Sequence, residues 1–351
     1  MREIAAKAEV ALSTVSQVLN NRANVAPDTR ERVLQAAAEL GYRPKVAIDA
    51  PFAATSSTIG LITRRRNHER LIVNPFYSYI IAGVERECQR QHINLMYANL
   101  EVDERNHAQS LPGMLLNELV DGVIIVGAFL EEAVADISRR IRRNIVLVDG
   151  YTSQEAFDSV LIDNYAGAVN AVTHLLDHGH RHIGLIGSSP DAYPSVLERR
   201  RGYLAALAAR GIEQTYIEDS PRLERIDAYD AALRLLKRCP QITAIFAIND
   251  DSAIGVLNAA RELGRRVPDN LSVIGFDDID LAQEVTPALT TIHVDKVLMG
   301  TMALRLLRDR VSDPERMAIT TTITTQLIAR ESQADLALPL SREEAPPLGV
   351  G

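Results

Sequence analysis

The chain of 351 residues contains no tryptophan, only two cysteines and no long apolar segment. Cys88 and Cys239 are far apart in the sequence and show no CxxC spacing, which argues against a disulfide framework and against a thiolate metal site. The longest apolar run, residues 119–130, is interrupted by Asp121 and is too short to span a bilayer. The amino-terminus has no apolar core of the signal-peptide kind. We therefore expect a cytoplasmic protein with no membrane partner.

The motifs of common catalytic sites are missing as well. The sequence has no GxSxG elbow, no HExxH helix and no phosphate-cradling GxxxxGKS loop. The acidic stretch 277–280 could suggest a magnesium site, but no phosphate-binding loop accompanies it. A metal site on a strand is suggested by the alternating histidines His178, His180 and His182. However, Gly179 between the first two is typical of a helix end. The sequence thus predicts a protein that is not an enzyme and holds no metal or cofactor.

What the sequence does contain is the composition of a globular protein, with 46% hydrophobic and 24% charged residues. A chain of this length accommodates two or three domains. Residues 1–46 carry seven Lys and Arg against five Asp and Glu, a net charge of +2, whereas the remainder carries a net charge of −10. This asymmetry favours an amino-terminal segment that approaches phosphate and a larger body that does not.

Residues 1–46 show the pattern of three short helices. Apolar residues recur at helical spacing over 2–8, 13–19 and 28–40, and only a few residues separate the first two segments. This arrangement is typical of a helix-turn-helix, whose second helix enters the major groove. The inward face of the third helix is expected to hold Val33, Leu34, Ala37 and Leu40. The polar residues that remain exposed on the second helix are Ser13, Thr14, Ser16 and Gln17.

The exposed side chains of the second helix suit contacts with DNA. Hydroxyl groups bind phosphate or either kind of base, and Gln17 can pair with adenine through two hydrogen bonds. The spacing alone also fits a small helical bundle with solvated Ser and Thr, because amphipathic three-helix patterns are common.

A different pattern begins after residue 46. The linker 47–58 lacks helical periodicity and contains Pro51. Beyond it, apolar runs bounded by Gly or Asp alternate with helical patterns, as buried parallel strands and their crossover helices do. The expected strands are 58–63, 94–98, 122–126, 145–148, 159–162, 183–186, 244–247, 272–276 and 291–293. The expected helices are 79–91, 108–119, 166–177, 197–210, 229–237, 251–263 and 297–309.

An alternation of this length predicts an α/β core of two Rossmann-like lobes behind the all-α head. One lobe is expected to comprise 59–162 and 292–320, and the other 163–291 and 321–331. The Pro-rich, charged tail 332–351 is expected to be disordered. Ligands of such sheets bind outside the carboxyl ends of the strands, so we expect the site between the two lobes.

Several motifs, taken in order, carry a resemblance to a known family. They are ThrValSer followed by ValLeuAsn in the head, GlyTyrArgPro at 41–44, AsnProPheTyr at 74–77, HisGlyHisArgHisIleGlyLeuIleGly at 178–187, IleAsnAspAspSerAlaIleGly at 248–255 and GlyPheAspAsp at 275–278. From residue 2 to about residue 331 the chain resembles the lactose-repressor (LacI/GalR) family of bacterial transcription regulators. The resemblance implies a homodimer whose two heads read a pseudo-palindromic operator. It also implies a periplasmic-binding-protein-like core that responds to a small effector.

The resemblance further implies roles for individual residues of the head. Base-reading positions are occupied by Leu12, Ser13 and Gln17. Positions at which the family contacts phosphate are occupied by Ala11, Thr14, Ser16, Asn20, Thr29 and Tyr42. Arg22 is added on its charge alone, and packing beneath the third helix is an equal alternative for Tyr42.

In the core, the positions that match the family's effector site are Asn74, Phe76, Tyr77, Arg199, Asn249 and Asp277. An Asp accepts from two adjacent hydroxyls, an Asn donates and accepts, an Arg clamps, and an aromatic face stacks on C–H groups. These types suit a sugar, and a purine or nucleoside equally. A capping or loop role is the alternative for each polar residue taken singly.

The function implied is that of a repressor whose operator affinity is modulated by a sugar or related metabolite. The alternative is a cytoplasmic small-molecule sensor or solute-binding protein that does not act through DNA. The helix-turn-helix pattern of the head argues against this alternative.

Among the places where the sequence departs from the family pattern are the linker and the first turn of the head. Asp49 and Pro51 stand where family members commonly carry the Arg and Leu of a hinge helix that wedges into the minor groove. A Pro cannot insert as Leu does, and an Asp places negative charge near phosphate, so we predict weak or absent hinge-helix formation. Glu9 stands where the first turn usually has Gly, which predicts a strained turn if the backbone there needs a positive φ.

Overall fold

The structure is a computed structural model that describes residues 2–19, 25–40, 57–66, 75–103, 107–127, 131–141, 144–152, 156–190, 192–220 and 222–336. Four of the predicted site residues lie outside these ranges, namely Asn20, Arg22, Tyr42 and Asn74. The linker residues 48–51, on which the hinge-helix prediction rests, lie outside them too.

The head consists of three helices, α1 (Arg2–Lys7), α2 (Leu12–Leu19) and α3 (Pro27–Glu39), close to the predicted bounds. Their shared core is entirely apolar and includes Ile4, Val15, Val18 and Val33. Leu34 and Leu40 were expected on the same inward face, but they are 44% and 41% exposed. The expectation was wrong because small residues, Ala36 and Ala37 among them, fill the space between α3 and its neighbours.

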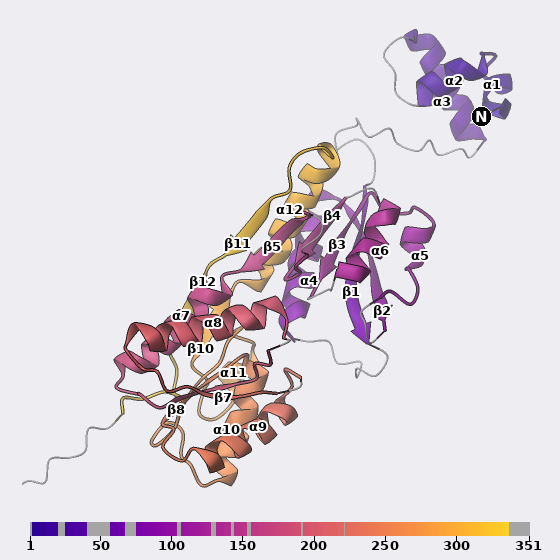
Figure 1. Ribbon diagram of the computed structural model, residues 1–351. Helices are drawn as coiled ribbons and strands as arrows, with labels where there is room; N and C mark the ends of the chain where they lie inside the picture. The colour runs from indigo at the N-terminus through magenta and orange to yellow at the C-terminus, as the bar shows by residue number, and fades with distance from the viewer. Residues whose placement is uncertain are drawn as a thin grey trace, which may run out of the picture.

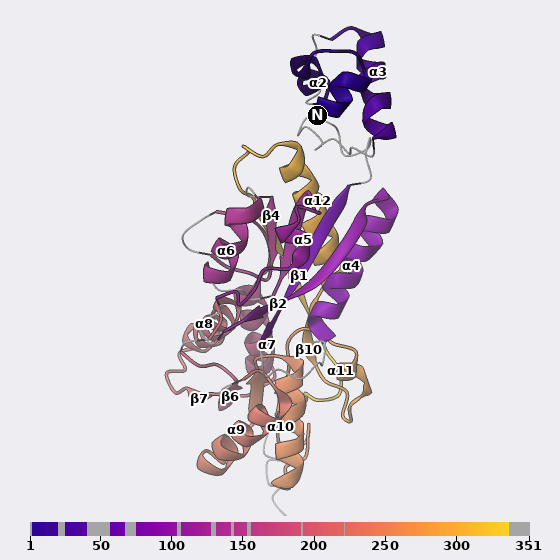
Figure 2. The same cartoon turned by 90° about the vertical axis from the view of Figure 1, so that its right-hand side faces the viewer.

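The N-lobe contains a six-stranded parallel sheet with α/β connections (Figures 1 and 2). Its strand order is β11-β5-β4-β3-β1-β2. The strands are β1 (Thr58–Arg66), β2 (Asn94–Val102), β3 (Gly122–Val126), β4 (Ile145–Val148), β5 (Asp158–Ile162) and β11 (Thr320–Ile323). The helices are α4 (Pro75–Gln91), α5 (Gly113–Leu116), α6 (Glu131–Ile141) and α12 (Lys296–Ser312).

Both faces of this sheet are buried, which is why its strands read as unbroken apolar runs. Along β3, Ile124 and Val126 share one core cluster with residues of α4 and α12, while Val123 and Ile125 belong to a second cluster with residues of α6. Successive side chains of a strand alternate between the faces of a sheet, so a helical layer on each side buries every position.

The C-lobe contains a smaller parallel sheet of order β7-β6-β8-β9. Its strands are β6 (Ile183–Ile186), β7 (Tyr216–Glu218), β8 (Ala244–Ala247) and β9 (Ser272–Ile274). Its helices are α7 (Asn164–Asp177), α8 (Pro194–Ala209), α9 (Arg225–Arg238), α10 (Asp250–Glu262) and α11 (Leu281–Glu284). The helix pairs α7–α8 and α9–α10 each pack closely together. Because all four strands are parallel, the loops after β6 and β8 meet at one edge of the sheet.

The chain passes between the lobes three times. The first passage follows β5, and the other two run through β10 (Thr291–Val294) and β12 (Thr325–Ile328), which pair antiparallel. β11 pairs with β5 as far as Ile323, so the last passage comes after that residue rather than at the predicted boundary of 320. Among the residues that the structure describes, no helix combines the length and apolar character that a membrane span requires.

The helix expected over 108–119 was wrong. Only Gly113–Leu116 is helical, and Ala108 instead forms a bridge with Val102. Pro112 accounts for the difference, since a proline in a helix interior lacks the N–H donor and clashes with the preceding turn. Helix α6 was not predicted although its apolar residues recur at helical spacing. The strands β7, β11 and β12 were not predicted because each is only three or four residues long and carries polar residues.

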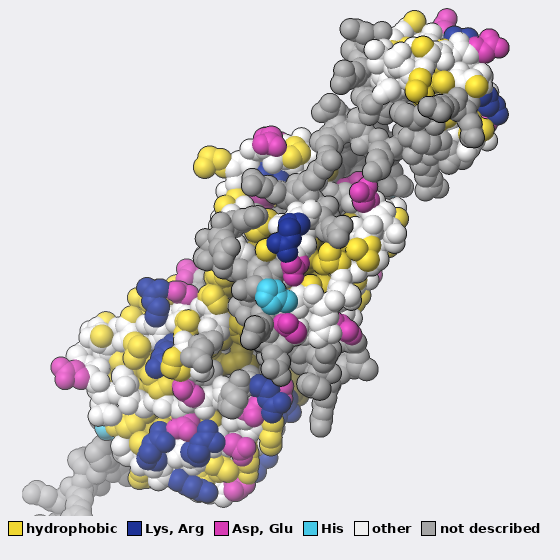
Figure 3. Space-filling view, turned by 45° about the vertical axis from the view of Figure 1, so that its right-hand side comes forward, with side chains coloured by type: hydrophobic (Ala, Val, Ile, Leu, Met, Phe, Trp, Pro, Cys, Tyr) yellow, Lys and Arg dark blue, Asp and Glu magenta, His cyan; other side chains and the backbone are white. Residues whose placement is uncertain are grey.

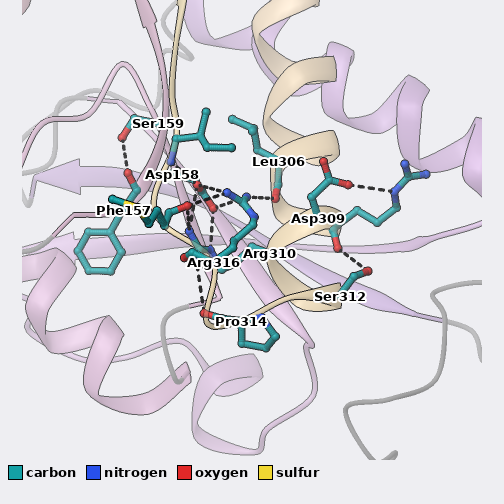
Figure 4. Close-up of polar contacts among 12 residues, drawn as sticks. Phe157, Asp158, Ser159, Leu306, Asp309, Arg310, Ser312, Pro314 and Arg316 are labelled. Carbon is teal, nitrogen blue, oxygen red and sulfur yellow. Dashed lines mark hydrogen bonds and ion pairs between the residues drawn. The ribbon is translucent and has the colours of Figure 1, made fainter.

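A buried ion cluster joins α12 to the first residue of β5 (Figure 4). The Asp158 side chain is fully buried and accepts hydrogen bonds from both Arg310 and Arg316, at distances between 2.7 and 3.1 Å. It also accepts the backbone N–H of Ile319 at 2.8 Å. One carboxylate thus holds together the turn between α12 and β11, and through it the edge of the N-lobe sheet.

The prediction of a disordered tail is wrong for residues 332–336. Ser332 is fully buried, and its hydroxyl donates to the carbonyl of Val273 at 2.6 Å. The backbone N–H of Leu336 donates to the carbonyl of His178 at 2.9 Å. Residues 332–336 therefore belong to the C-lobe, and residues 337–351 lie outside the described ranges.

Candidate functional site

The first candidate surface is the exposed face of α2. Val15 and Val18 point into the head, with exposed fractions of 0% and 3%. The opposite face carries Leu12, Ser13 and Gln17, all exposed, while Thr14 and Ser16 are half-buried at its margins. Thr29, in the first turn of α3, is also half-buried. Five predicted DNA contacts thus lie on one short helix, and all six of these side chains are at least partly accessible.

The turn between α1 and α2 requires a left-handed residue. Glu9 has a φ of 52°, and the N–H of Val10 donates to the carbonyl of Ala5 at 3.0 Å. This is the helix-ending pattern in which the residue after the helix adopts the left-handed conformation that favours Gly. The prediction of a strained turn at Glu9 is therefore confirmed. Lys7 and Glu39 form a 2.8 Å ion pair that ties α1 to α3.

The second candidate site lies at the junction of the two lobes and centres on Arg199. This side chain is 6% exposed and uses each of its nitrogen atoms. It donates to Asn164 Oδ1 at 2.8 Å, to the carbonyl of Ile248 at 2.6 Å and to Asp277 Oδ1 at 3.1 Å. Its guanidinium also lies 3.7 Å from the centre of the Phe276 ring. Arg199 is therefore held rigidly, with its charge balanced by one carboxylate and one aromatic face.

Asp277 lies in the loop after β9, and its backbone has a φ of 109°. Burial raises the pKa of its carboxyl group, while the charges of Arg199 and Lys296 oppose that rise. Lys296 donates to the backbone carbonyls of Asp277 and Asp278, which fixes the loop. The carboxylate is thus positioned by groups that leave part of it available for a ligand's hydroxyls.

The N-lobe contributes Tyr77 and Asp149 to the same junction. The Tyr77 hydroxyl donates to Asp149 Oδ2 at 3.1 Å, and Asp149 Oδ1 is buried without a hydrogen-bond partner in the structure. Burial raises the pKa of Asp149 to about 6, with Arg199 of the C-lobe acting in the opposite direction. Burial and Asp149 together raise the pKa of Tyr77 well above its usual value. A buried acceptor of this kind favours a ligand that brings hydrogen-bond donors.

The junction also concentrates backbone strain. Among the described residues, the non-glycine residues with positive φ are Glu9, His92, Glu118, Asp149, Asp277 and Asp278. Three of these are junction aspartates. Strained backbone persists where the surrounding structure over-determines it, and it clusters at ligand sites, so the pattern supports a binding role.

Two predicted effector residues have structural roles. Asn249 caps α10, accepting from the N–H of Ser252 at 2.9 Å and donating to the carbonyl of Leu223 at 3.3 Å. Phe76 is 6% exposed, belongs to the N-lobe core and packs edge-on against Tyr77. The structure thus brings together Tyr77, Arg199 and Asp277 of the predicted set.

Sequence reasoning missed Asp149 and Asn164 as members of this site. Asp149 directly follows β4 and Asn164 begins α7 after β5, so both sit at the carboxyl ends of predicted strands. That position was itself a usable signal, because ligands of parallel sheets bind there.

On the face of the C-lobe shown in Figure 3, Lys and Arg side chains are interspersed with Asp and Glu and form no continuous basic patch. Several of its arginines are paired. Arg234 and Arg238 both contact Glu218, at 2.7 and 2.8 Å, and Arg225 contacts Asp251 at 2.7 Å. Mixed charge of this kind is typical of a solvated surface rather than of a nucleic-acid interface.

Comparisons with known proteins agree with this division into head and lobes. Residues 1–45 match the model for "Bacterial regulatory proteins, lacI family", and residues 172–333 match the "Periplasmic binding protein-like domain". The chain is 31% identical over 344 residues to the HTH-type transcriptional repressor PurR of Mannheimia succiniciproducens, with 96% of this chain and 99% of that protein covered. This chain belongs to the lacI family of bacterial regulatory proteins. The predicted family and fold class are thereby confirmed.

Two further lacI-family relatives are similar over nearly their whole length. The ribose operon repressor of Haemophilus influenzae is 32% identical over 338 residues, which cover 95% of this chain and 98% of that protein. A solved structure of the transcriptional regulator CelR in complex with cellobiose is 30% identical, with a TM-score of 0.70 and coverage of 94% and 98%. As a lacI-family member, this chain is a DNA-binding transcription regulator.

Proposed function

We propose that the protein is a repressor whose α2 reads an operator and whose operator affinity changes when a sugar or nucleoside binds between the lobes. The observation that carries the proposal is the separation of faces on α2, where apolar residues close the core of the head and hydroxyl and carboxamide groups remain outside. The protein works as a cytoplasmic homodimer and catalyses no reaction.

The chemistry of the α2 face supports direct readout. Gln17 presents a carboxamide that can pair with adenine, and Ser13 presents a hydroxyl that can contact either kind of base. Leu12, 46% exposed, offers an apolar contact for a thymine methyl group. Thr14, Ser16 and Thr29 supply short polar groups for phosphate, which fix the position of the helix without reading sequence.

The junction supports a polyhydroxyl ligand. Asp149 and Asp277 supply acceptors from opposite lobes, and Arg199 lies close enough to affect the pKa of both. A ligand that bridges the two carboxylates binds one arrangement of the lobes better than others. It can therefore shift the equilibrium between arrangements by its difference in affinity for them.

Two experiments test this function. Selection of binding sites from a randomised duplex library by the intact protein should return a pseudo-palindromic sequence, since a symmetric dimer presents two identical heads. Recovery of no enriched sequence would support the alternative of a sensor that does not act through DNA.

The second experiment is a thermal-shift screen with ribose, cellobiose, free purines and nucleosides. A ligand that binds the native state raises its melting temperature, and Asp277→Ala should abolish the shift. A shift that is unchanged in Asp277→Ala would reject the junction as the binding site.

A further inference from the structure

Among the described residues, several side-chain contacts cross from one lobe to the other near the junction, and two of them are Arg64–Tyr193 and Tyr79–Asp280. Arg64, on β1 of the N-lobe, donates through Nη1 to the Tyr193 hydroxyl at 2.7 Å. Tyr193 is the residue before α8 of the C-lobe. Tyr79, on α4, donates its hydroxyl to Asp280, the residue before α11. These contacts join residues 129 and 201 positions apart in the chain.

The Arg64–Tyr193 contact lies next to the proposed effector site. The charge of Arg64 acts on Tyr77, since it opposes the rise in the pKa of that phenol, and Asp277 of the other lobe acts on the same group. The Arg64 guanidinium also lies 5.5 Å from the centre of the Tyr193 ring. Arg64 therefore contacts Tyr193 through both its hydroxyl and its ring face.

The charged groups at the centre of the junction are largely shielded from solvent in this arrangement. Arg199, Asp277 and Asp149 are 6%, 8% and 6% exposed, respectively. A ligand can reach these groups only after the lobes separate, and any separation must break the side-chain contacts that cross the junction. These contacts therefore lower the fraction of molecules in which the site is open.

We propose that Arg64 and Tyr193 form a latch that holds the two lobes together, and that this latch sets the rate of effector entry. The role in effector entry rests on the proposed function, but the latch itself can be measured without any effector. A hydrogen bond with one charged partner changes an equilibrium by about tenfold or more. Loss of Arg64 should thus raise the open fraction by about tenfold.

Opening can be measured through a thiol placed inside the junction. Ser195 is 6% exposed and lies one helical turn before Arg199 on α8. A Ser195→Cys substitution in a Cys239→Ser background therefore gives a junction thiol that a disulfide reagent reaches when the lobes part. Cys88 remains as an internal control, because it is 2% exposed in the N-lobe core and burial raises its pKa to about 12.

The experiment compares labelling rates of the junction thiol in the ligand-free full chain. We expect Arg64→Ala to accelerate labelling about tenfold, and Tyr193→Phe to accelerate it less, because the ring face remains. Arg266→Ala is the matched control, since Arg266 forms an exposed ion pair with Asp269 beyond the end of α10. Labelling of Cys88 should stay slow in every variant.

An unchanged labelling rate of the junction thiol in Arg64→Ala would overturn the latch, and so would an equal acceleration at Cys88, which would indicate global unfolding instead. A second arm adds ribose, cellobiose or guanosine and asks whether the ligand slows labelling of the junction thiol. Failure of all three ligands to protect would count against the proposed effector class while leaving the latch result intact.

Discussion

The head and the lobe junction keep their functional side chains in opposite environments. In the head, the core is wholly apolar and the polar residues of α2 lie outside it. At the junction, Arg199, Asp149 and Asp277 are all buried, and three aspartates there have strained backbones. The polar side chains that contact a DNA duplex can be solvated in the free protein. A site that distinguishes small molecules excludes water, so the charges buried in it must be paired.

The difference predicts that the lobes depend on buried charge and that the head does not. The Asp158 cluster gives the largest expected effect. Asp158→Ala leaves the buried Arg310 and the half-buried Arg316 without their carboxylate, so the free energy of unfolding of the core should fall by about 3 to 5 kcal/mol. Calorimetry of the full chain measures this as a lower melting temperature of the lobes.

The control for this substitution is Asp269→Ala, which removes an exposed ion pair with Arg266. Its effect should stay within about 0.5 kcal/mol. Similar losses of unfolding free energy in the two variants would mean that burial does not increase the contribution of the Asp158 cluster to stability.

The second prediction concerns Asp149, whose effect on stability and whose effect on ligand binding can be measured separately. Its folded pKa of about 6 lies above the ordinary value of 3.8, so the native state is favoured by protonation and loses stability as the pH rises toward and through 6. Asp149→Asn removes that penalty. We expect the variant to match the wild type near pH 4 and to exceed it by on the order of 2 to 3 kcal/mol above pH 7.

The same substitution should weaken the response to effector, because it removes the negative charge and replaces one of the two acceptor oxygens, of which Oδ1 has no partner in the structure, with an NH2 donor. Chemical unfolding across this pH range, together with ligand titration, tests both halves. A variant that is less stable than the wild type at pH 8 would show that the charged form of Asp149 stabilises the fold.

A third prediction concerns the exposed face of the head. Gln17→Ala should cost on the order of 1 to 3 kcal/mol of discrimination at one base step of the operator, with little change in melting temperature. Fluorescence anisotropy on matched duplexes that differ at single positions measures this loss. An equal loss on every sequence would argue that Gln17 contacts only the backbone of the DNA.

The smallest effect is expected at the first turn of the head. Glu9 has a positive φ, and a Gly at this position should stabilise the head by about 1 kcal/mol. Glu9→Ala is the control, since it removes the charge while keeping the Cβ. Equal stabilisation by Ala and Gly would assign the effect to charge rather than to backbone strain.

The same contrast explains what the sequence could and could not predict. Helical spacing separates the faces of α2 within a single turn, so Ser13 and Gln17 were placed correctly on the exposed side. Apolar runs likewise located most strands of both sheets. Leu34 was misplaced, because periodicity alone does not say how wide an inward face must be.

At the junction, local pattern carried less information. The partners of Arg199 come from α7, from the end of β8 and from the loop after β9, which only the folded chain brings together. Asn249 is the converse case, a residue that was predicted as a ligand contact and has a structural role instead. Its residue type fitted a ligand contact, but its amide already bonds Ser252 and Leu223. Whether a polar side chain is free for a ligand depends on neighbours distant in sequence.

Titration of the selected operator duplex with wild type, Gln17→Ala and Asp277→Ala, each with and without the ligand found by thermal shift, shows whether α2 binds the operator and whether the lobe junction controls this binding. We expect that ligand changes the wild-type dissociation constant, that Gln17→Ala loses sequence discrimination while keeping the ligand response, and that Asp277→Ala binds DNA but does not respond to ligand. An Asp277→Ala protein that still responds fully to ligand would show that the junction does not control DNA binding.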